Sequence, residues 1–381
     1  MKIIYVLTKP FGILGAAASY MLPTIMAKRG HDIKVICYHP SNNSGDLIYN
    51  LDKKTEDNFS ITYVTNKVNL AIILRKSISK YQPHIVHIFF HPRAFIFPLI
   101  CKLTCWSPSR PKWVLDIRSP KIILNKRNII KKFMDPIKQF CFDAVSTHAE
   151  YSACSQLRLV KKALYVVPPG VNLCNFKQNH FDQDKSEKQR PVRKFLYIGS
   201  LAKARKINIL LNAIAYAKIR LKNNINFFVD IYGGGNDYSN LQKKVIELQL
   251  QDIVHFKGTL PQQELFSKMN CYDAGLAYVP EDNYEHAPCL KTMEYMASGL
   301  FVLGSNTHGN RIFITNEKNG LLAKNSCEEF GEMIVRTVTK GLPGKFINNS
   351  KEIICKYDWD NIVVENLIPM YESIIRGNAN L

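Results

Sequence analysis

Residues 2–37 read KIIYVLTKPFGILGAAASYMLPTIMAKRGHDIKVIC. The stretch opens with a short apolar, β-branched run at Lys2–Leu7, passes a glycine-containing loop at Gly12–Gly15, and continues as a segment with helical periodicity. A second β-branched run follows at Asp32–Cys37. A strand, a helix and a strand in this order predict a βαβ unit, and therefore a parallel sheet covered by helices.

The same alternation of short β-branched runs and helical segments continues almost to the end of the chain. Further strands of this first series are expected at His84–Phe89, Trp113–Asp116, Ala144–Ser146 and Leu164–Val167. A second series of strands is expected at Lys194–Ile198, Asn226–Tyr232, Ile253–Lys257, Ala274–Tyr278 and Leu300–Gly304. Between the two series lies a polar stretch that is poor in apolar residues.

These patterns predict an α/β protein with two doubly wound, Rossmann-like domains. The expected boundaries are 1–180 for the first domain, 181–193 for a polar linker and 194–355 for the second domain. Ligands of such sheets bind at the carboxyl ends of the strands, so we expect the site in a central cleft that both domains face.

The composition describes an ordinary globular protein with a one-sided charge. The chain has 381 residues, 46% hydrophobic and 22% charged, which disfavours disordered and collagen-like classes. The formal net charge is +20; residues 1–190 hold 29 Lys and Arg against 12 Asp and Glu, whereas residues 191–381 hold 22 against 19. We therefore expect the first half to meet an anion, such as a nucleic acid, a membrane surface or a phosphorylated substrate.

The cysteines and the apolar runs indicate where in the cell the protein is expected. The ten cysteines include no CxxC pair, so no metal site is expected. The N-terminal sequence lacks the features of a signal peptide, and the longest apolar run, Ala94–Cys101, contains Pro98 and is shorter than the roughly 18 residues of a membrane span. We expect a cytoplasmic protein with reduced thiols that does not cross a bilayer.

Two glycine-containing strand ends in the second half suit a phosphorylated ligand. The strand end Tyr197–Leu201 is followed by the cations Lys203, Arg205 and Lys206 before a helix, an arrangement that fits a diphosphate or a merely solvated helix start. The glycine-rich strand exit Tyr232–Asp237 lacks the last glycine of a dinucleotide fingerprint, which disfavours an NAD site. It fits a ligand-binding exit or a plain tight turn.

A third motif spans Ala287–Gly299. Pro288 precedes a predicted helix, Gly299 ends it, and Lys291 and Glu294 share one helix face at i and i+3. Such a pair is most often a surface ion pair worth about 0.2–0.5 kcal/mol.

Taken together with Val254–Gly258 and Asn319–Leu322, these motifs resemble the donor half of the family 4 nucleotide-sugar glycosyltransferases of the GT-B fold, bacterial surface-polysaccharide type. The resemblance is strongest in residues 194–325. It extends into the first half through Gly12–Gly15, Lys28–His31, Asp116–Arg118, and Pro168–Asn172 with Phe176. It also implies that residues 356–381 form a helix that crosses back to the first domain.

The resemblance implies roles for individual residues. Arg205 and Lys291 would bind the diphosphate, and Glu294 would accept hydrogen bonds from the ribose hydroxyls; these three are the catalytic candidates. His255 and Phe256 would contact the base. The other donor-binding candidates are Gly15, Gly199, Ser200, Lys206, Gly233, Gly234, His286 and Leu290.

The sequence departs from the family pattern at two positions. Ser200 stands where a basic residue often follows the strand-end glycine, which leaves Arg205 and Lys206 as the main nearby cations. His286 stands where the family has the first glutamate of a pair, with Glu285 beside it. Either residue could occupy that place.

The acceptor-side candidates are Asp116, Arg118 and His91, which follow strands of the first domain. Asp116 and Arg118 could equally pair with each other, and a structural role is the more common one for a histidine such as His91. Residues 121–140 form an amphipathic pattern with basic residues on one face, typical of a core-packed helix or of a helix that docks on anionic lipid.

The resemblance predicts a metal-independent, retaining hexosyltransferase with no cofactor besides its nucleotide-sugar donor. The donor nucleoside is expected to be uridine in preference to guanosine, and the acceptor a lipid-linked glycan in cell-surface polysaccharide or lipopolysaccharide biosynthesis. Peripheral contact with the anionic inner face of the plasma membrane is expected from the basic first domain. A nucleotide-sugar epimerase of similar fold is the alternative; a nucleic-acid-binding protein is disfavoured because no RRM, KH or zinc-finger signature is present.

Overall fold

The computed structural model describes residues 1–7, 9–12, 17–39, 57–90, 94–104, 110–118, 141–149, 164–176, 189–222 and 226–377. The chain forms two compact units, one made of Met1–Gly170 with Trp359–Leu381 and the other of Val171–Asp358. We call them unit 1 and unit 2. The sequence placed the divisions at 180 and 355. Most of the expected linker lies outside the described residues, and Gln189–Arg190 at its end form a short strand, β8, paired with β15 (Leu342–Pro343).

Unit 1 is built on a seven-stranded parallel sheet with the order β3-β2-β1-β4-β5-β6-β7. Its strands are β1 (Lys2–Val6), β2 (Asp32–Tyr38), β3 (Phe59–Val64), β4 (Ile85–Phe89), β5 (Lys112–Ile117), β6 (Ala144–Thr147) and β7 (Leu164–Val166). Helix α1 (Ala18–Lys28) packs on one face of the sheet, and α2 (Lys67–Tyr81) and α3 (Ile96–Thr104) pack on the other.

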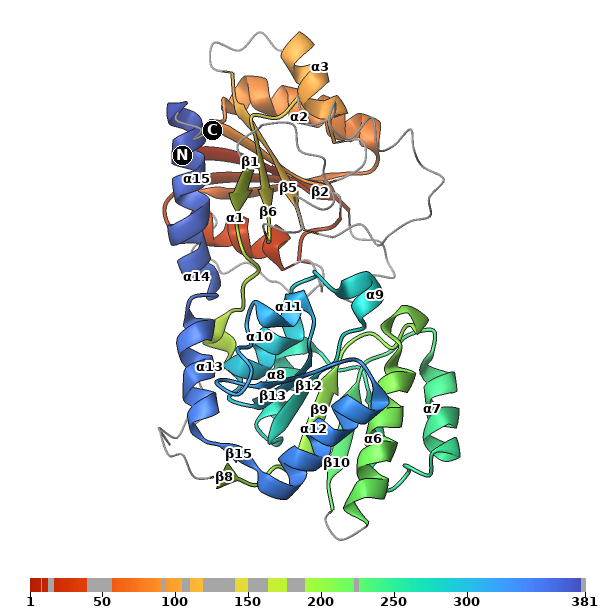
Figure 1. Cartoon of the computed structure of the whole chain (residues 1–381). Coiled ribbons are helices and arrows are strands. Elements are labelled where there is room, and N and C mark those ends of the chain that lie inside the picture. Colours follow the sequence, from red (N-terminus) through yellow and green to blue (C-terminus); the bar gives the residue numbers. More distant parts are fainter. Residues whose placement is uncertain are drawn as a thin grey trace. The chain divides into compact units, whose positions relative to one another are not determined.

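The C-terminal segment completes unit 1. It consists of α14 (Trp359–Ile362), the π-helical η4 (Val363–Leu367) and α15 (Ile368–Arg376), and it runs beside α1 (Figure 1). Its apolar side chains enter the same core as those of α1 and β1. Gly170 makes room for this segment, because a Cβ there would lie 2.5 Å from Cδ2 of Trp359. Burial of the Trp359 ring therefore fixes where the segment rejoins the sheet.

Unit 2 contains a six-stranded parallel sheet with the order β11-β10-β9-β12-β13-β14. The strands are β9 (Lys194–Ile198), β10 (Phe228–Tyr232), β11 (Val254–Gly258), β12 (Ala274–Ala277), β13 (Phe301–Ser305) and β14 (Leu321–Ala323). One face packs against α6 (Ile207–Leu221), α7 (Tyr238–Glu247) and α12 (Cys327–Lys340). The other packs against α8 (Gln262–Met269), α10 (Leu290–Ala297) and the end of α13 (Lys345–Cys355). The short helices are η2 (Leu173–Phe176), η3 (Lys203–Arg205), α9 (Glu281–Tyr284) and α11 (His308–Arg311).

In each sheet the first strand is central. The next two strands are added on one side of it, and the following strands are added on its other side. The order therefore reverses between β1 and β4 in unit 1 and between β9 and β12 in unit 2. This is the doubly wound arrangement, so the predicted fold class is confirmed. The sequence missed two edge strands, β3 and β14. In β3 the polar side chains of Ser60 and Thr62 interrupt the apolar run.

No helix in the described parts of the chain has the length and apolar character required to span a bilayer.

Gly233 fixes how the exits of β9 and β10 pack. Its φ of +145° is a conformation that only glycine adopts readily, and a Cβ there would lie 1.9 Å from the backbone oxygen of Gly199. Gly234 is different, since its nearest neighbour would be the Thr259 methyl carbon, Cγ2, at 3.4 Å.

Gly233→Ala is therefore expected to destabilise unit 2 by about 3 kcal/mol or more, because backbone strain and overlap add. For a unit of this size, that change lowers the thermal unfolding midpoint by roughly 6–12 °C. Gly234→Ala is the matched control and should shift the midpoint by no more than about 2 °C. Equal midpoints for the two variants in a calorimetric scan would contradict the packing role.

Candidate functional site

The candidate site lies where the strand order of the unit 2 sheet reverses, at the carboxyl ends of β9 and β12. Strand β9 pairs with β10 along its whole length, from Lys194 to Ile198. With β12 it pairs only at Phe195 and Leu196, so the two strands separate toward their carboxyl ends. Such a reversal point is where doubly wound sheets bind ligands.

The separation of β9 from β12 is held by a tyrosine of α10. The hydroxyl oxygen of Tyr295 accepts a hydrogen bond from the backbone N–H of Ile198 at 2.9 Å, in place of a strand partner. Its ring fits only because residue 275 is glycine, since a Cβ there would lie 2.2 Å from Cδ2 of Tyr295. Tyr295 and Gly275 are structural determinants of the site that the sequence analysis missed. A glycine inside a strand is a signal of such close approach.

Lys291 lies directly over this gap. Its Nζ donates to the backbone oxygen of Tyr278, just after β12, at 3.0 Å, and lies 4.0 Å from the centre of the Tyr197 ring in β9. It would also lie 3.5 Å from a Cβ on Gly199, at the end of β9. Burial lowers the pKa of Lys291 to about 8, and the charge of Arg205 acts in the same direction. A bound anion would stabilise the protonated ammonium of Lys291, which burial disfavours.

Arg205 is a second cation beyond the carboxyl end of β9. It ends η3, after the β9 exit, and its guanidinium carbon lies 4.1 Å from the centre of the Tyr284 ring. Stacking on the ring fixes the plane of the guanidinium without using its charge on a carboxylate. Among the described residues, no carboxylate lies within salt-bridge distance of Arg205 or Lys291, so both cations can bind an anion.

Glu294 lies one turn beyond Lys291 on α10, partly buried. Burial raises its pKa to about 7, although the charge of Lys291 and a hydrogen bond from the Gln262 side chain act in the opposite direction. The structure does not hold the surface ion pair that the spacing allowed, because Lys291 contacts Tyr278 and Tyr197 instead. A carboxylate with this much unused acceptor capacity suits vicinal hydroxyl groups.

The glycines of the two strand exits contact each other. Gly199 donates its N–H to the Tyr232 oxygen at 3.0 Å, Gly233 packs on Gly199, and the Gly234 oxygen accepts from Leu201 N–H at 2.9 Å. The structure therefore gives Gly233 a packing role inside the protein. Ser200, between these contacts, is exposed.

Lys206 differs from the other two cations. Its ammonium forms an ion pair with Asp282, whose pKa this interaction lowers. The positive charge of Lys206 is therefore shared with a carboxylate, and the site's cations are Arg205 and Lys291.

His255 and Phe256 lie on opposite faces of the sheet, as neighbours in a strand must. His255 lies 3.2 Å from Asp230 through its Nδ1 and stacks on Phe228, whereas Phe256 packs against Tyr238 and the α6–α7 core. The two side chains therefore point to different faces, and their contact with the base stays a prediction. If only one of them contacts the base, the half-exposed His255 is the better placed of the two.

Glu285 and His286 precede α10 and contact α11. The carboxylate of Glu285 accepts from the backbone N–H of His308 at 2.9 Å and lies 3.5 Å from Arg311. The rings of His286 and His308 are 5.4 Å apart, and burial lowers the pKa of His286. The Glu285 carboxylate is thus engaged with α11 through both contacts. Leu290 begins α10 and is exposed.

The acceptor-side candidates of unit 1 form a buried network. Asp116 is fully buried; its Oδ2 accepts from Arg118 Nε at 2.8 Å and lies 3.2 Å from His87 Nε2. His87 Nδ1 in turn lies 2.8 Å from the Tyr371 hydroxyl. Asp116 therefore positions Arg118, and its own side chain is not exposed. The pairing that the sequence left open is present.

Three further predictions lie outside the described residues. They are Gly15, His91 and the amphipathic segment 121–140.

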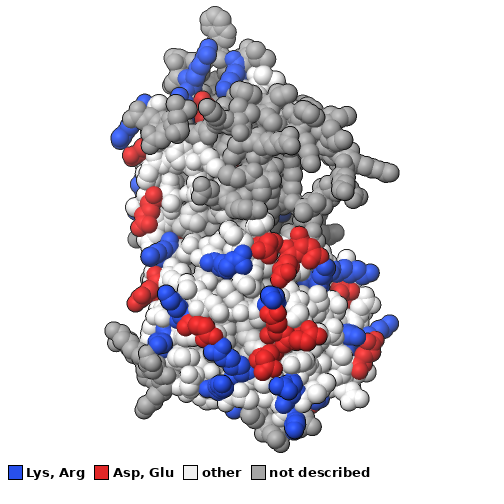
Figure 2. All heavy atoms as spheres, viewed as in Figure 1, with Lys and Arg blue, Asp and Glu red and all other residues white. Residues whose placement is uncertain are grey.

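The charge distribution over unit 2 is mixed. Figure 2 shows acidic and basic side chains interspersed on the face of unit 2 that it presents, as the near-equal counts in residues 191–381 require. The cations of the candidate site thus act locally and not as part of a broad positive surface. No cluster of metal-ligating side chains occurs within the described ranges.

The second half of the chain matches a known protein family. Residues 178–352 match the family model of glycosyl transferases group 1. A curated relative, the GtfA subunit of a UDP-N-acetylglucosamine–peptide N-acetylglucosaminyltransferase from Streptococcus gordonii, is 24% identical over 169 residues. That alignment covers 44% of this chain and 31% of the relative, so the chain matches about a third of that protein's length.

Many solved structures match over nearly the whole chain, among them the following two. Sucrose-phosphate synthase from Thermosynechococcus elongatus superposes with a TM-score of 0.74 at 15% identity, covering 99% of this chain and 100% of that one. HepE of Anabaena, solved in complex with UDP-glucose, superposes with a TM-score of 0.66 at 13% identity and full coverage of both chains.

The chain has the GT-B fold of glycosyltransferases, and its second unit matches a glycosyltransferase family model. The epimerase alternative is not favoured by these matches.

Proposed function

We propose that the chain is a family 4 glycosyltransferase that moves a hexose from a UDP-sugar to a lipid-linked glycan, with retention of configuration. Cell-surface polysaccharide or lipopolysaccharide synthesis, at the cytoplasmic face of the plasma membrane, is the proposed setting. The observation that carries the proposal is the placement of Lys291 over the gap between β9 and β12, beside Arg205 and one turn from Glu294. The UDP-sugar in the relatives' names supports uridine as the base.

In this proposal the cations act on the leaving group. Negative charge grows on the diphosphate as its bond to the sugar breaks, and fixed cations in a partly buried site stabilise that charge. Arg205 and Lys291 would supply this stabilisation without a metal ion, and Glu294 would hold the ribose so that the diphosphate reaches them. The carboxylate would accept from both ribose hydroxyls.

The acceptor and the membrane contact rest on unit 1. The excess of 29 basic over 12 acidic residues in positions 1–190 favours a phosphate-bearing acceptor and an anionic surface. Arg118, which Asp116 and the backbone oxygen of Val167 hold in place, would be the residue of this unit that meets the acceptor. Segment 121–140, with Lys131 and Lys132, is the proposed lipid-binding helix.

The pKa values of Glu294 and Lys291 predict how donor binding depends on pH. Below about pH 7 Glu294 gains a proton and loses acceptor capacity; above about pH 8 Lys291 loses its proton and its charge. The affinity for UDP-glucose, whose own diphosphate has no proton to titrate in this range, should therefore be highest between these values. It should fall by up to about tenfold per pH unit on either side.

Isothermal titration across pH 5.5–9.5 would check this. Glu294→Gln should remove the acid limb alone, and Lys291→Met the alkaline limb alone. A flat profile for the unsubstituted protein would contradict the assignment.

The function itself is tested by a thermal-shift screen with nucleoside diphosphates and their sugars. A ligand at a hundred times its Kd stabilises the native state by about 2.7 kcal/mol, so a uridine series should raise the unfolding midpoint and a guanosine series should not. Incubation of the stabilising donor alone should leave its sugar unchanged; formation of an isomeric sugar nucleotide would identify an epimerase. No shift with any nucleotide would overturn the proposal.

A further inference from the structure

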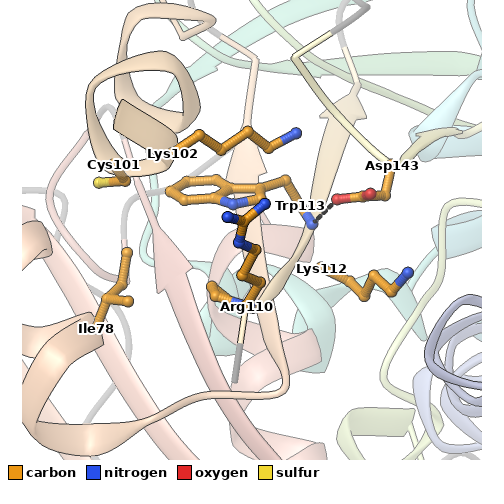
Figure 3. Close-up of a pocket in the computed structure, with 8 residues that line it drawn as sticks. Ile78, Cys101, Lys102, Arg110, Lys112, Trp113 and Asp143 are labelled. Carbon is orange, nitrogen blue, oxygen red and sulfur yellow. Dashed lines mark hydrogen bonds between the residues drawn. The ribbon is translucent and has the colours of Figure 1, made fainter. Parts of the chain in front are cut away.

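Unit 1 carries a basic groove on the edge of its sheet where the strands begin. A first hollow, with a volume of about 300 Å³, is lined by Lys102, Arg110 and Lys112 around Trp113 (Figure 3). A second hollow of about 370 Å³ is lined by Lys2 and by the same Arg110 and Lys112. Arg110 and Lys112 line both hollows, so the two hollows adjoin, and we call them together the groove.

The groove is far from the carboxyl-end edge where Arg118 lies. Lys112 is the first residue of β5, and Ile117 is the last. At about 3.3 Å per residue, the two edges of the sheet are about 17 Å apart along this strand. The groove is therefore a separate feature of unit 1 and not part of the proposed acceptor site.

The groove has an excess of positive charge without internal compensation. Its described lining includes four cations, and the only carboxylate is that of Asp143, which accepts from the Trp113 backbone N–H at 2.7 Å. No described carboxylate lies within salt-bridge distance of Arg110 or Lys112. Cations gathered in a hollow repel one another, and a bound anion relieves that repulsion.

Two of these cations lie beside Trp113. Figure 3 shows the Lys102 and Arg110 side chains on either side of the Trp113 indole, which is almost fully buried. Lys102 Nζ also donates to the Cys141 backbone oxygen at 3.0 Å. The charge of Lys102 is thus partly preorganised, which lowers the entropic cost of binding an anion.

Exposed apolar side chains flank the groove at both ends. On α3, Leu99 is 45% exposed and lies three residues before Lys102 on the same helix face. On α15, Ile375 lines the second hollow and is 37% exposed. Cations for phosphate beside apolar side chains for acyl chains are the combination used by proteins that dock on anionic lipid.

We propose that this groove binds the phosphate of an anionic lipid headgroup, with Arg110 and Lys112 as its central contacts. Leu99 then enters the headgroup layer beside it. The inference rests on the membrane contact of the proposed function, and it names a surface for that contact other than segment 121–140.

Cosedimentation with vesicles of equimolar phosphatidylcholine and phosphatidylglycerol tests the groove. Arg110→Gln/Lys112→Gln should weaken vesicle partitioning by about 30-fold, because each basic residue near an anionic surface contributes about fivefold. The matched control is Lys67→Gln/Lys76→Gln, which removes two exposed charges of α2 outside the groove, and it should weaken partitioning by less than about threefold. Neither pair should bind vesicles of phosphatidylcholine alone.

If both double variants lost vesicle partitioning equally, the attraction would be a diffuse effect of charge. That result would overturn the proposal that the groove binds the lipid headgroup. Loss in Lys131→Gln/Lys132→Gln with no loss in the Arg110/Lys112 pair would also overturn it, while leaving the membrane contact of the proposed function intact. Absence of binding to the anionic vesicles by the unsubstituted chain would overturn both.

The source of the phosphate is tested by NMR of indole ¹⁵N-labelled protein, which has only three tryptophans. The Trp113 resonance, assigned with Trp113→Phe, should move with dihexanoyl phosphatidylglycerol and stay in place with inorganic phosphate at the same concentration. A response to inorganic phosphate and none to the lipid would assign the groove to a free anion and overturn the lipid headgroup.

Discussion

Arg205→Ala should lower the rate of sugar transfer by about 10²–10³, the usual cost of removing one preorganised charge from a developing anion. The guanidinium stacks on Tyr284 at 4.1 Å and has no carboxylate partner among the described residues, so its whole charge is available to the diphosphate. The effect should fall mainly on kcat, because the negative charge grows between the bound donor and the transition state.

Lys203→Ala is the matched control for this variant. Lys203 is an exposed cation in the same short helix, η3, two residues earlier. Its removal lowers the local positive charge by the same amount, so a general electrostatic effect would slow both variants. We expect transfer by the control to stay within about threefold of the unsubstituted enzyme. Near-normal turnover of Arg205→Ala would show that the diphosphate lies elsewhere.

Glu294→Gln should weaken UDP binding by roughly 10- to 150-fold, the equivalent of about 1.5–3 kcal/mol for hydrogen bonds to a charged group. The amide has nearly the same shape as the carboxylate but only one acceptor oxygen and no charge. The fold should tolerate Glu294→Gln, because a neutral amide avoids the cost of burying a charge. The same cost raises the pKa of Glu294.

A double-mutant cycle with 2′,3′-dideoxy-UDP makes the Glu294 assignment specific. The unsubstituted protein should lose on the dideoxy ligand about as much affinity as Glu294→Gln loses on UDP. The variant itself should hardly distinguish the two ligands, since the partner of the hydroxyls is already gone. Glu264→Gln on the neighbouring α8, where the carboxylate is exposed and paired with Lys268, is the control and should bind both ligands like the unsubstituted protein. If the two losses of affinity were additive, Glu294 would not contact the ribose hydroxyls.

The sequence predicted the central strands well because they are continuous apolar runs. Strand β9 has the predicted bounds, and the other predicted strands lie within two residues of theirs. Strands buried on both faces read as unbroken hydrophobic segments, whereas an edge strand such as β3 keeps one side polar. The expected place of a ligand site, at the carboxyl ends of the strands, also follows once two doubly wound series are recognised.

The details of the site depend on contacts that sequence patterns do not encode. Tyr295 appeared only as part of a motif, yet its hydroxyl replaces a strand partner and its ring requires Gly275. The burial that moves the pKa values of Lys291 and Glu294 comes from β9, β12 and α8, which are distant in sequence.

Strand geometry alone separates two of the predicted base contacts. His255 and Phe256 are adjacent in β11, and adjacent strand residues point to opposite faces. A base near the end of this strand would therefore meet the two residues differently, and their contact with the base stays a prediction.

The most direct test of the central claim is a crystal structure of the protein with UDP bound. The account predicts phosphate oxygens within hydrogen-bond distance of both the Arg205 guanidinium and the Lys291 ammonium, with the ribose hydroxyls on the Glu294 carboxylate. Density for the diphosphate away from the gap between β9 and β12, with those three side chains uncontacted, would contradict it.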